Sequence, residues 1–159
     1  MEGDHNLLEI KSNLDKVIRE LQERISVKAI NELTKEVAET IYQNSVKRIF
    51  NNGRALDGSK IGNYRKSTKL ARRKRGLQTS YVDLTFTGTF RRLYRLRKLG
   101  FAGYVIGFPP GNLYGEYIIS HNEKHFGKKI FGLTKEDQKI AKGLVDKFII
   151  SANKSKGLK

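Results

Sequence analysis

The chain has 159 residues, a length that is typical of one domain. Its 32 Lys and Arg outnumber 16 Asp and Glu, so the net charge of +16 favours nucleic acid, an anionic membrane or acidic protein surfaces as partners. The absence of Cys excludes disulfides and thiolate metal sites, and no apolar run approaches the roughly 20 residues that span a bilayer.

The first six residues, Met-Glu-Gly-Asp-His-Asn, are acidic and polar. A signal peptide begins instead with a positively charged segment followed by an apolar one. We therefore expect a protein that is made in the cytosol and is not exported. Of the partners that the charge favours, we expect nucleic acid or acidic protein and no membrane.

The positive charge is concentrated in the middle of the chain. Residues 60–98 contain 13 Lys and Arg but a single acid, Asp83, and so carry a net charge of +12. The first 59 residues are close to neutral by comparison. The cationic character therefore belongs to the middle of the chain and not to a disordered tail.

Two helices are predicted before residue 52. The first spans residues 4 to 25, because apolar residues recur there at three- and four-residue steps: Leu7, Ile10, Leu14, Val17, Leu21 and Ile25. This spacing allows a partner helix in another chain, but barely three heptads are present, so we favour packing on the chain's own domain. The second runs from Ser26 to about Asn51, where Asn51-Asn52-Gly53 is a typical helix stop.

The next segment is predicted as a loop followed by a short basic helix. Asn52-Gly53 and Asp57-Gly58 are turn dipeptides within the loop of residues 51–64. The basic helix extends from Ser67 to Gly76. Residues 77–83 carry no strong signal and are predicted to be a flexible connector.

Residues 84–108 are predicted to form a turn and a β-hairpin. The alternating threonines from Thr85 to Thr89 favour β structure. Residues 91–99 are expected to be a half-buried strand with an arginine-rich outer face, and Tyr104 to Phe108 to be the central strand of the sheet.

The last third of the chain is predicted to contain a short helix, an edge strand and a final helix. The short helix lies within residues 112–122 and the edge strand spans Lys128 to Leu133. Thr134 and Asp137 resemble a capping box that opens the final helix.

These elements predict a single domain, residues 1–159. Its parts are a helical region over 1–51, a loop and basic helix over 52–83, a small β-sheet region over 84–133, a helix over 134–152 and a basic tail over 153–159.

The sequence contains none of the common motifs for catalysis. The chain has no phosphate-binding loop, dinucleotide fingerprint, zinc-protease helix or nucleophile elbow. His121 and His125 are four residues apart, as two metal ligands on one helix face would be, but Glu123 is poorly placed as a third. We expect no catalytic residue, no metal site and no cofactor.

The basic residues are candidate contacts to DNA in a channel or to acidic partners in an assembly. They are Lys69, Arg72, Arg73, Lys74, Arg75, Arg91, Arg92 and Arg95. Aromatic residues interleave with them, which is compatible with gripping phosphates, but charge runs are more often solvated faces. Composition alone leaves these two interpretations about equal.

Seven short motifs, in this order, resemble those of the phage virion-morphogenesis family, the tail-completion and neck proteins of tailed phages. They are Arg48 and Phe50 with Gly53; Asp57-Gly58 followed by Ile61, where the family usually has Trp; Ser67-Thr68; Leu84-Thr85-Phe86-Thr87-Gly88-Thr89-Phe90-Arg91; Tyr104-Val105-Ile106-Gly107; Tyr117 with His121-Asn122; and Lys129-Ile130-Phe131-Gly132-Leu133-Thr134. Together they cover about residues 46 to 150.

The resemblance implies an α+β fold, with a long N-terminal helix or helix pair and a C-terminal helix packed on a small antiparallel β-sheet. It assigns structural roles to the motif residues Gly53, Asp57, Gly58, Leu84, Thr87, Gly88, Tyr117, His121, Phe131 and Gly132. It also implies a virion protein, assembled in the host cytoplasm, that completes or terminates the tail at the head–tail junction. Such a protein forms a ring of its own copies, typically a hexamer, and contacts the tail tube, the neck or connector proteins and packaged DNA.

Two other functions stay open at this point. The chain could be a small DNA-binding protein that uses the cationic segment of residues 65–98. A metal-dependent enzyme is the third alternative, and it would require bound metal at His121 and His125.

Overall fold

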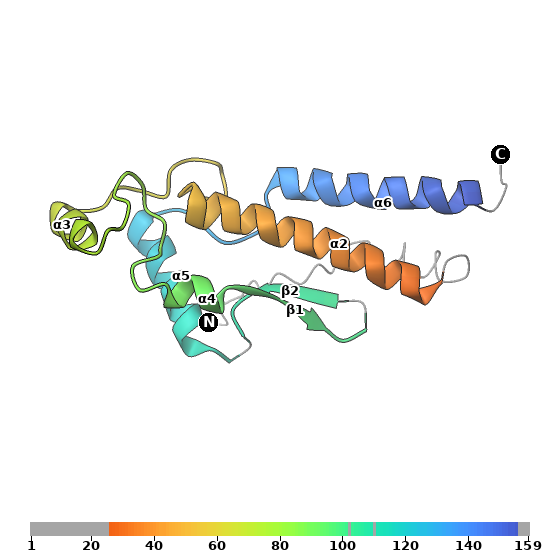
Figure 1. Cartoon of the computed structure of the whole chain (residues 1–159), viewed down its shortest axis with the longest axis horizontal. Coiled ribbons are helices and arrows are strands. Elements are labelled where there is room, and N and C mark those ends of the chain that lie inside the picture. The colour runs from red at the N-terminus through yellow and green to blue at the C-terminus, as the bar shows by residue number, and fades with distance from the viewer. Residues whose placement is uncertain (1–25, 102, 110, 156–159) are drawn as a thin grey trace. The chain divides into compact units, whose positions relative to one another are not determined.

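The computed structural model describes residues 26–101, 103–109 and 111–155 (Figure 1). The helix predicted over residues 4–25 and the end of the basic tail lie outside them. The chain divides into two compact units. The first is built from residues 1–42, 96–106 and 135–159, and the second from residues 43–95 and 107–134. We call the described parts of these the hairpin unit and the aromatic unit. The single domain stays a prediction.

The hairpin unit contains most of helix α2 (Val27–Val46), a two-stranded sheet and helix α6 (Lys135–Ser155). The Ser26 hydroxyl accepts a hydrogen bond from the amide of Ala29 at 3.3 Å and so caps α2. Buried residues of α2 recur at helical spacing, namely Ile30, Val37, Ala38 and Ile41. Figure 1 draws α2 between α6 and the hairpin.

The sheet pairs β1 (Arg95–Leu99) with β2 (Gly103–Gly107) in antiparallel fashion. Val105 and Ile106 of β2 are buried. The sequence predicted that Tyr104 to Phe108 is the central strand of the sheet. This prediction is wrong, because the described residues form a sheet of two strands, in which neither strand is central. The predicted α+β class, with a long N-terminal helix, a C-terminal helix and a small antiparallel sheet, is confirmed.

The aromatic unit packs short helices around a cluster of rings. Its helices are the π-helical turn η1 (Lys47–Asn51), which continues α2, and α3 (Lys66–Lys74), α4 (Thr89–Leu93) and α5 (Leu113–Phe126). The ring cluster consists of Phe50, Phe90, Tyr94, Phe108 and Phe131, with centroid separations between 4.8 and 6.3 Å. Most of these pairs meet edge to face, which is a favourable geometry for aromatic rings.

The predicted arginine-rich strand over residues 91–99 is wrong in its first half. The chain forms α4 there and enters β1 only at Arg95. Gly88 has a φ of +75°, which turns the chain into α4, and Phe90 is then buried in the ring cluster. Arg91 and Arg92 are therefore helical residues.

The edge strand predicted over residues 128–133 is also wrong. The amides of Ile130 and Phe131 donate to the carboxylate of Glu123 at 2.8 and 3.1 Å. The carbonyl of Lys129 accepts from the amide of Leu56 at 2.8 Å. Because a carboxylate and a loop amide already bind this backbone, it does not form a sheet ladder.

The other predicted helices are present with shifted ends. The basic helix is α3, and the helix expected over 112–122 is α5, which continues to Phe126 and ends at Gly127 with a φ of +62°. The final helix α6 begins directly after Thr134.

Candidate docking site

A buried ion pair joins Arg72 and Asp83 in the aromatic unit. Nη2 of Arg72, on α3, is 2.7 Å from Oδ2 of Asp83, and the two side chains are only 1% and 6% exposed. The Arg72 guanidinium also lies 4.5 Å from the centroid of the Tyr64 ring. Arg72 therefore ties α3 to two loops and is not an outward contact for DNA or a partner, contrary to the sequence-based expectation.

Asp83 organises the segment that the sequence presented as a flexible connector. Its carboxylate accepts hydrogen bonds from the side chains of Gln78 and Tyr64 and from the amide of Thr85. Nε of Arg72 donates to the carbonyl of Gln78 at 2.7 Å. Residues 77–85 are therefore held by a continuous polar network, and the flexible connector is a wrong prediction.

The network shifts two pKa values in opposite directions. Burial raises the pKa of Tyr64 to about 12, and the hydrogen bond and negative charge of Asp83 add to this rise. Burial would also raise the pKa of Asp83, but the hydrogen bonds from Gln78, Thr85 and Tyr64 outweigh it and leave this pKa below its ordinary value. Asp83 is thus a carboxylate and Tyr64 a neutral phenol at neutral pH.

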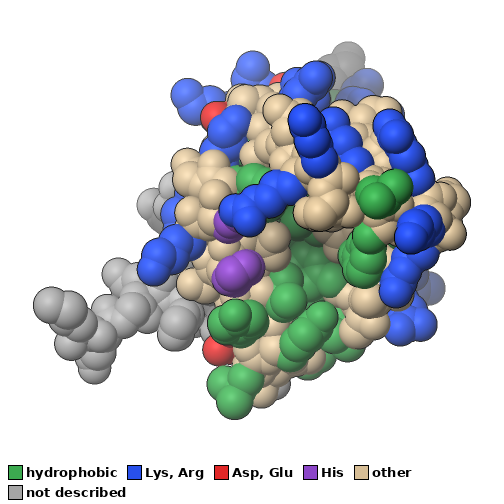
Figure 2. All heavy atoms as spheres, turned by 90° about the vertical axis from the view of Figure 1, so that its left-hand side faces the viewer, with side chains coloured by type: hydrophobic (Ala, Val, Ile, Leu, Met, Phe, Trp, Pro, Cys, Tyr) green, Lys and Arg blue, Asp and Glu red, His purple; other side chains and the backbone are tan. Residues whose placement is uncertain are grey.

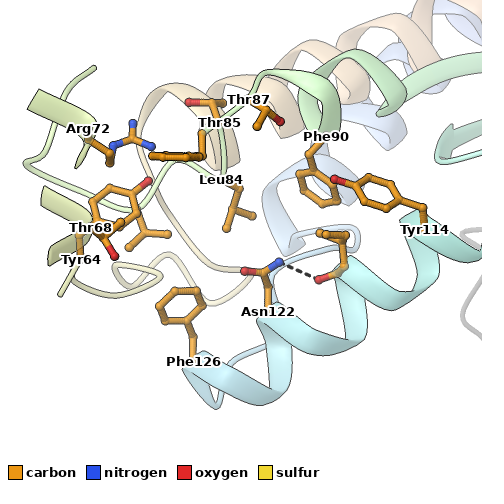
Figure 3. Close-up of a pocket in the computed structure, with 13 residues that line it drawn as sticks. Tyr64, Thr68, Arg72, Leu84, Thr85, Thr87, Phe90, Tyr114, Asn122 and Phe126 are labelled. Carbon is orange, nitrogen blue, oxygen red and sulfur yellow. Dashed lines mark hydrogen bonds between the residues drawn. The ribbon is translucent and has the colours of Figure 1, made fainter. Parts of the chain in front are cut away.

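A pocket of about 310 Å³ lies beside this network, between α3, the segment from Val82 to Phe90, and α5 (Figure 3). Thr68 and Arg72 line it from α3, and Leu84 and Phe90 from the connecting segment. The α5 side is a row of residues at four-residue steps, Tyr114, Ile118, Asn122 and Phe126. Asn122 is fixed by a hydrogen bond to the carbonyl of Ile118 at 2.7 Å.

Exposed apolar side chains extend this pocket across the surface of α5. Leu113 is 77% exposed, Tyr117 64% and Tyr114 47%, and Phe86 on the opposite wall is 40% exposed. Figure 2 shows hydrophobic side chains gathered in a hollow with Lys and Arg side chains at its margin. Contiguous apolar surface with a charged rim is typical of a protein interaction site.

The remaining basic candidates lie on or next to α3, on α4 and at the start of β1. Arg73, Lys74 and Arg75 are exposed, and Lys69 is half-buried. The Arg75 guanidinium lies 4.4 Å from the centroid of the pocket residue Phe86. Three further exposed arginines lie on α4 and at the start of β1, namely Arg91, Arg92 and Arg95.

Most residues of the resembling motifs serve the framework of the aromatic unit. Gly53 has a φ of +59°, and a Cβ there would lie 2.6 Å from both the Tyr81 ring and the Val82 carbonyl oxygen. Asp57 accepts hydrogen bonds from the amide and hydroxyl of Ser59 at 2.9 and 2.7 Å, which closes the turn at Gly58. The framework residues of the second half of the chain are Leu84, which lines the pocket at a φ of +53°, Thr87 and Gly88 before α4, and Phe131 and Gly132 after α5.

Tyr117 and His121 differ from the other motif residues because they are exposed on α5. Their rings stack at 5.6 Å, and His121 stacks on His125 at 6.2 Å. Among the described residues there is no group of three or more side chains that could hold a metal ion. None of the helices in the described ranges is long and apolar enough to cross a membrane.

Sequence reasoning missed Asp83, Gln78 and the α5 wall of the pocket. One signal was available for Asp83, which is the single acid among 13 basic residues in the segment 60–98. A lone acid in such a run is a candidate partner for a buried cation. Comparison of the chain with protein-family models, curated proteins and solved structures found no match.

Proposed function

We propose that the chain is a structural protein of a tailed-phage virion, without catalytic activity. It assembles with copies of itself into a ring at the head–tail junction, where it completes or terminates the tail and meets the tail tube and neck proteins. The family resemblance motivates this proposal. One observation carries it, namely that four of the resembling motifs converge on one framework although they are far apart in the sequence.

The first motif meets the last through Arg48. Its Nη1 donates to the carbonyl of Ile130 at 2.8 Å, and its Nη2 donates to the carbonyl of Gly132 at 3.4 Å. The loop that contains Asp57-Gly58 joins them, since a Cβ on Gly132 would lie 3.1 Å from the Leu56 side chain. These contacts favour the interpretation that the motifs belong to one framework. Unrelated short matches would not be expected to meet in this way.

The ring cluster joins the motif around Gly88 to the same framework. Phe90 lies 6.1 Å from Phe50 and 5.7 Å from Phe131, measured between ring centroids. Around this framework, exposed aromatic and arginine side chains offer the residue types that protein interfaces favour. An assembly role therefore suits the surface better than a catalytic one.

The proposal is tested by the state of the purified full-length chain. Light scattering after size-exclusion chromatography should give a single multiple of the 18.2 kDa chain mass, and electron micrographs should show closed rings. A monomer at every concentration, with and without tail proteins, would contradict it.

DNA binding is the second candidate, and the exposed basic residues Arg73, Lys74 and Arg75 at the end of α3 favour it. If these residues grip phosphates, the affinity for duplex DNA should fall by about 0.9 log unit per contact for each log unit of salt. Replacing all three by Gln should then reduce the slope of that salt dependence. Anisotropy measurements in which the triple variant keeps the full slope would remove this candidate.

A further inference from the structure

The aromatic unit leaves an apolar groove open on its surface. The groove is the 310 Å³ pocket together with the exposed α5 residues beside it. One wall is the α5 row of Tyr114, Ile118, Asn122 and Phe126, and Leu113 and Tyr117 are exposed on the same helix. Apolar grooves of this kind bind the apolar face of an amphipathic helix in other proteins.

The sequence contains a segment whose pattern fits such a groove. Residues 4–25 carry one apolar stripe at three- and four-residue steps, from Leu7 to Ile25. The segment also fits by charge. Residues 1–25 contain six acids and four bases and carry a net charge of −2, whereas the rest of the chain carries +18.

The aromatic unit is itself strongly basic. Its residues 43–95 and 107–134 contain 17 Lys and Arg against four Asp and Glu, a net charge of +13. The exposed guanidinium of Arg75, which lies 4.4 Å from the centroid of the pocket residue Phe86, would pair with a carboxylate next to the apolar stripe, such as that of Glu9 or Asp15.

The place of the segment in the chain favours exchange between copies. Residues 4–25 precede the first residue of α2, whereas the aromatic unit begins at its last turns. A helix of 20 residues rises about 30 Å, and the chain joins residues 4–25 and the aromatic unit to opposite ends of α2. In a head-to-tail ring, the arm of one subunit can reach a groove on its neighbour.

We propose that residues 4–25 of one copy bind in the apolar groove of the aromatic unit of a second copy. The apolar stripe packs against α5 and the acidic residues face the basic rim. This inference rests on the proposed ring and specifies which segment joins its subunits.

The natural absence of Cys makes a disulfide-trapping test clean. One full-length variant carries Leu14→Cys, and a second, lengthened by a tag, carries Tyr117→Cys. Mixed and mildly oxidised, they should form the mixed covalent dimer about tenfold more than a control pair of Leu14→Cys with Leu99→Cys, which corresponds to about 1.4 kcal/mol of preference. Leu99 is 52% exposed on β1 and is the matched surface control.

Each other outcome overturns the inference. A dimer dominated by Leu14→Cys with itself would show that the segments pair with each other. A third variant carries both Leu14→Cys and Tyr117→Cys. If its disulfide forms only within one chain, the segment binds in the groove of its own copy. A mixed dimer no more abundant than the control, in samples that still form rings by light scattering, would refute the docking while the ring stands. Loss of both the mixed dimer and the rings would refute the proposed ring as well.

Discussion

The two units of the chain are stabilised in different ways. The hairpin unit buries aliphatic side chains at regular spacing, such as Ile30, Val37 and Ile41 on α2 and Val105 on β2. The aromatic unit depends on directional contacts between distant segments, which are the ring cluster, the Arg72–Asp83 ion pair and the hydrogen bonds of Arg48. Periodic burial tolerates many substitutions of similar volume, whereas a directional contact fails when one partner is removed.

The largest effect is expected from Arg72→Met. The substitution leaves the buried carboxylate of Asp83 without its cation, so the free energy of unfolding should fall by about 3–5 kcal/mol. Urea denaturation followed by tyrosine fluorescence measures this, since the chain has no Trp. The exposed neighbour gives the matched control, Arg73→Met, which should change stability by less than about 0.5 kcal/mol. Equal effects of the two variants would contradict the buried pair.

A smaller loss is expected from Gly53→Ala. The backbone there is left-handed, which costs about 1–2 kcal/mol for Ala. The added Cβ also meets Tyr81 and the Val82 carbonyl, and overpacking costs about 1–3 kcal/mol more. Gly58→Ala isolates the first contribution, because its φ is +81° but a Cβ there has nothing within 4 Å in the described structure. Thermal melts in which the two variants are equally destabilised would show that the Tyr81 contact is not tight.

Two helical glycines should respond with opposite signs. Gly115 of α5 lies against Phe108, and an added Cβ would be 2.4 Å from that ring, so Gly115→Ala should destabilise by about 1–3 kcal/mol. Gly143 of α6 has nothing within 4 Å of the added atom among the described residues, so Gly143→Ala should stabilise by up to about 1 kcal/mol. Stabilisation by both substitutions would remove the distinction between the two units.

A further effect on stability is expected at the extremes of pH. Asp83 has a folded pKa below its unfolded value, so its contribution to stability is complete above an unfolded pKa of about 3.9 and is lost as the pH falls through the folded pKa. The pKa of Tyr64 is raised to about 12, so its contribution is complete below about pH 10 and is lost between there and pH 12. Tyr64→Phe should flatten the alkaline part of a plot of stability against pH. An unchanged alkaline part would contradict the burial of this phenol.

The same contrast explains what the sequence could predict. Helices α2 and α6 follow from apolar periodicity, and the hairpin follows from an arginine-rich segment and an apolar run separated by a glycine-bounded turn. The lone acid Asp83 hints at a buried cation, but the sequence could not predict that this cation is Arg72, because each cation within a basic run has the pattern of a solvated helix face. The strand expected near Arg91 failed for a related reason, since contacts of Phe90 with distant rings override the local preference of the threonines.

Immunogold labelling of tailed particles that carry this gene, with antibody against the chain, tests the proposed virion role most directly. The proposed function predicts label confined to the head–tail junction. Particles without label, together with the protein on intracellular DNA, would contradict that role and favour the DNA-binding alternative.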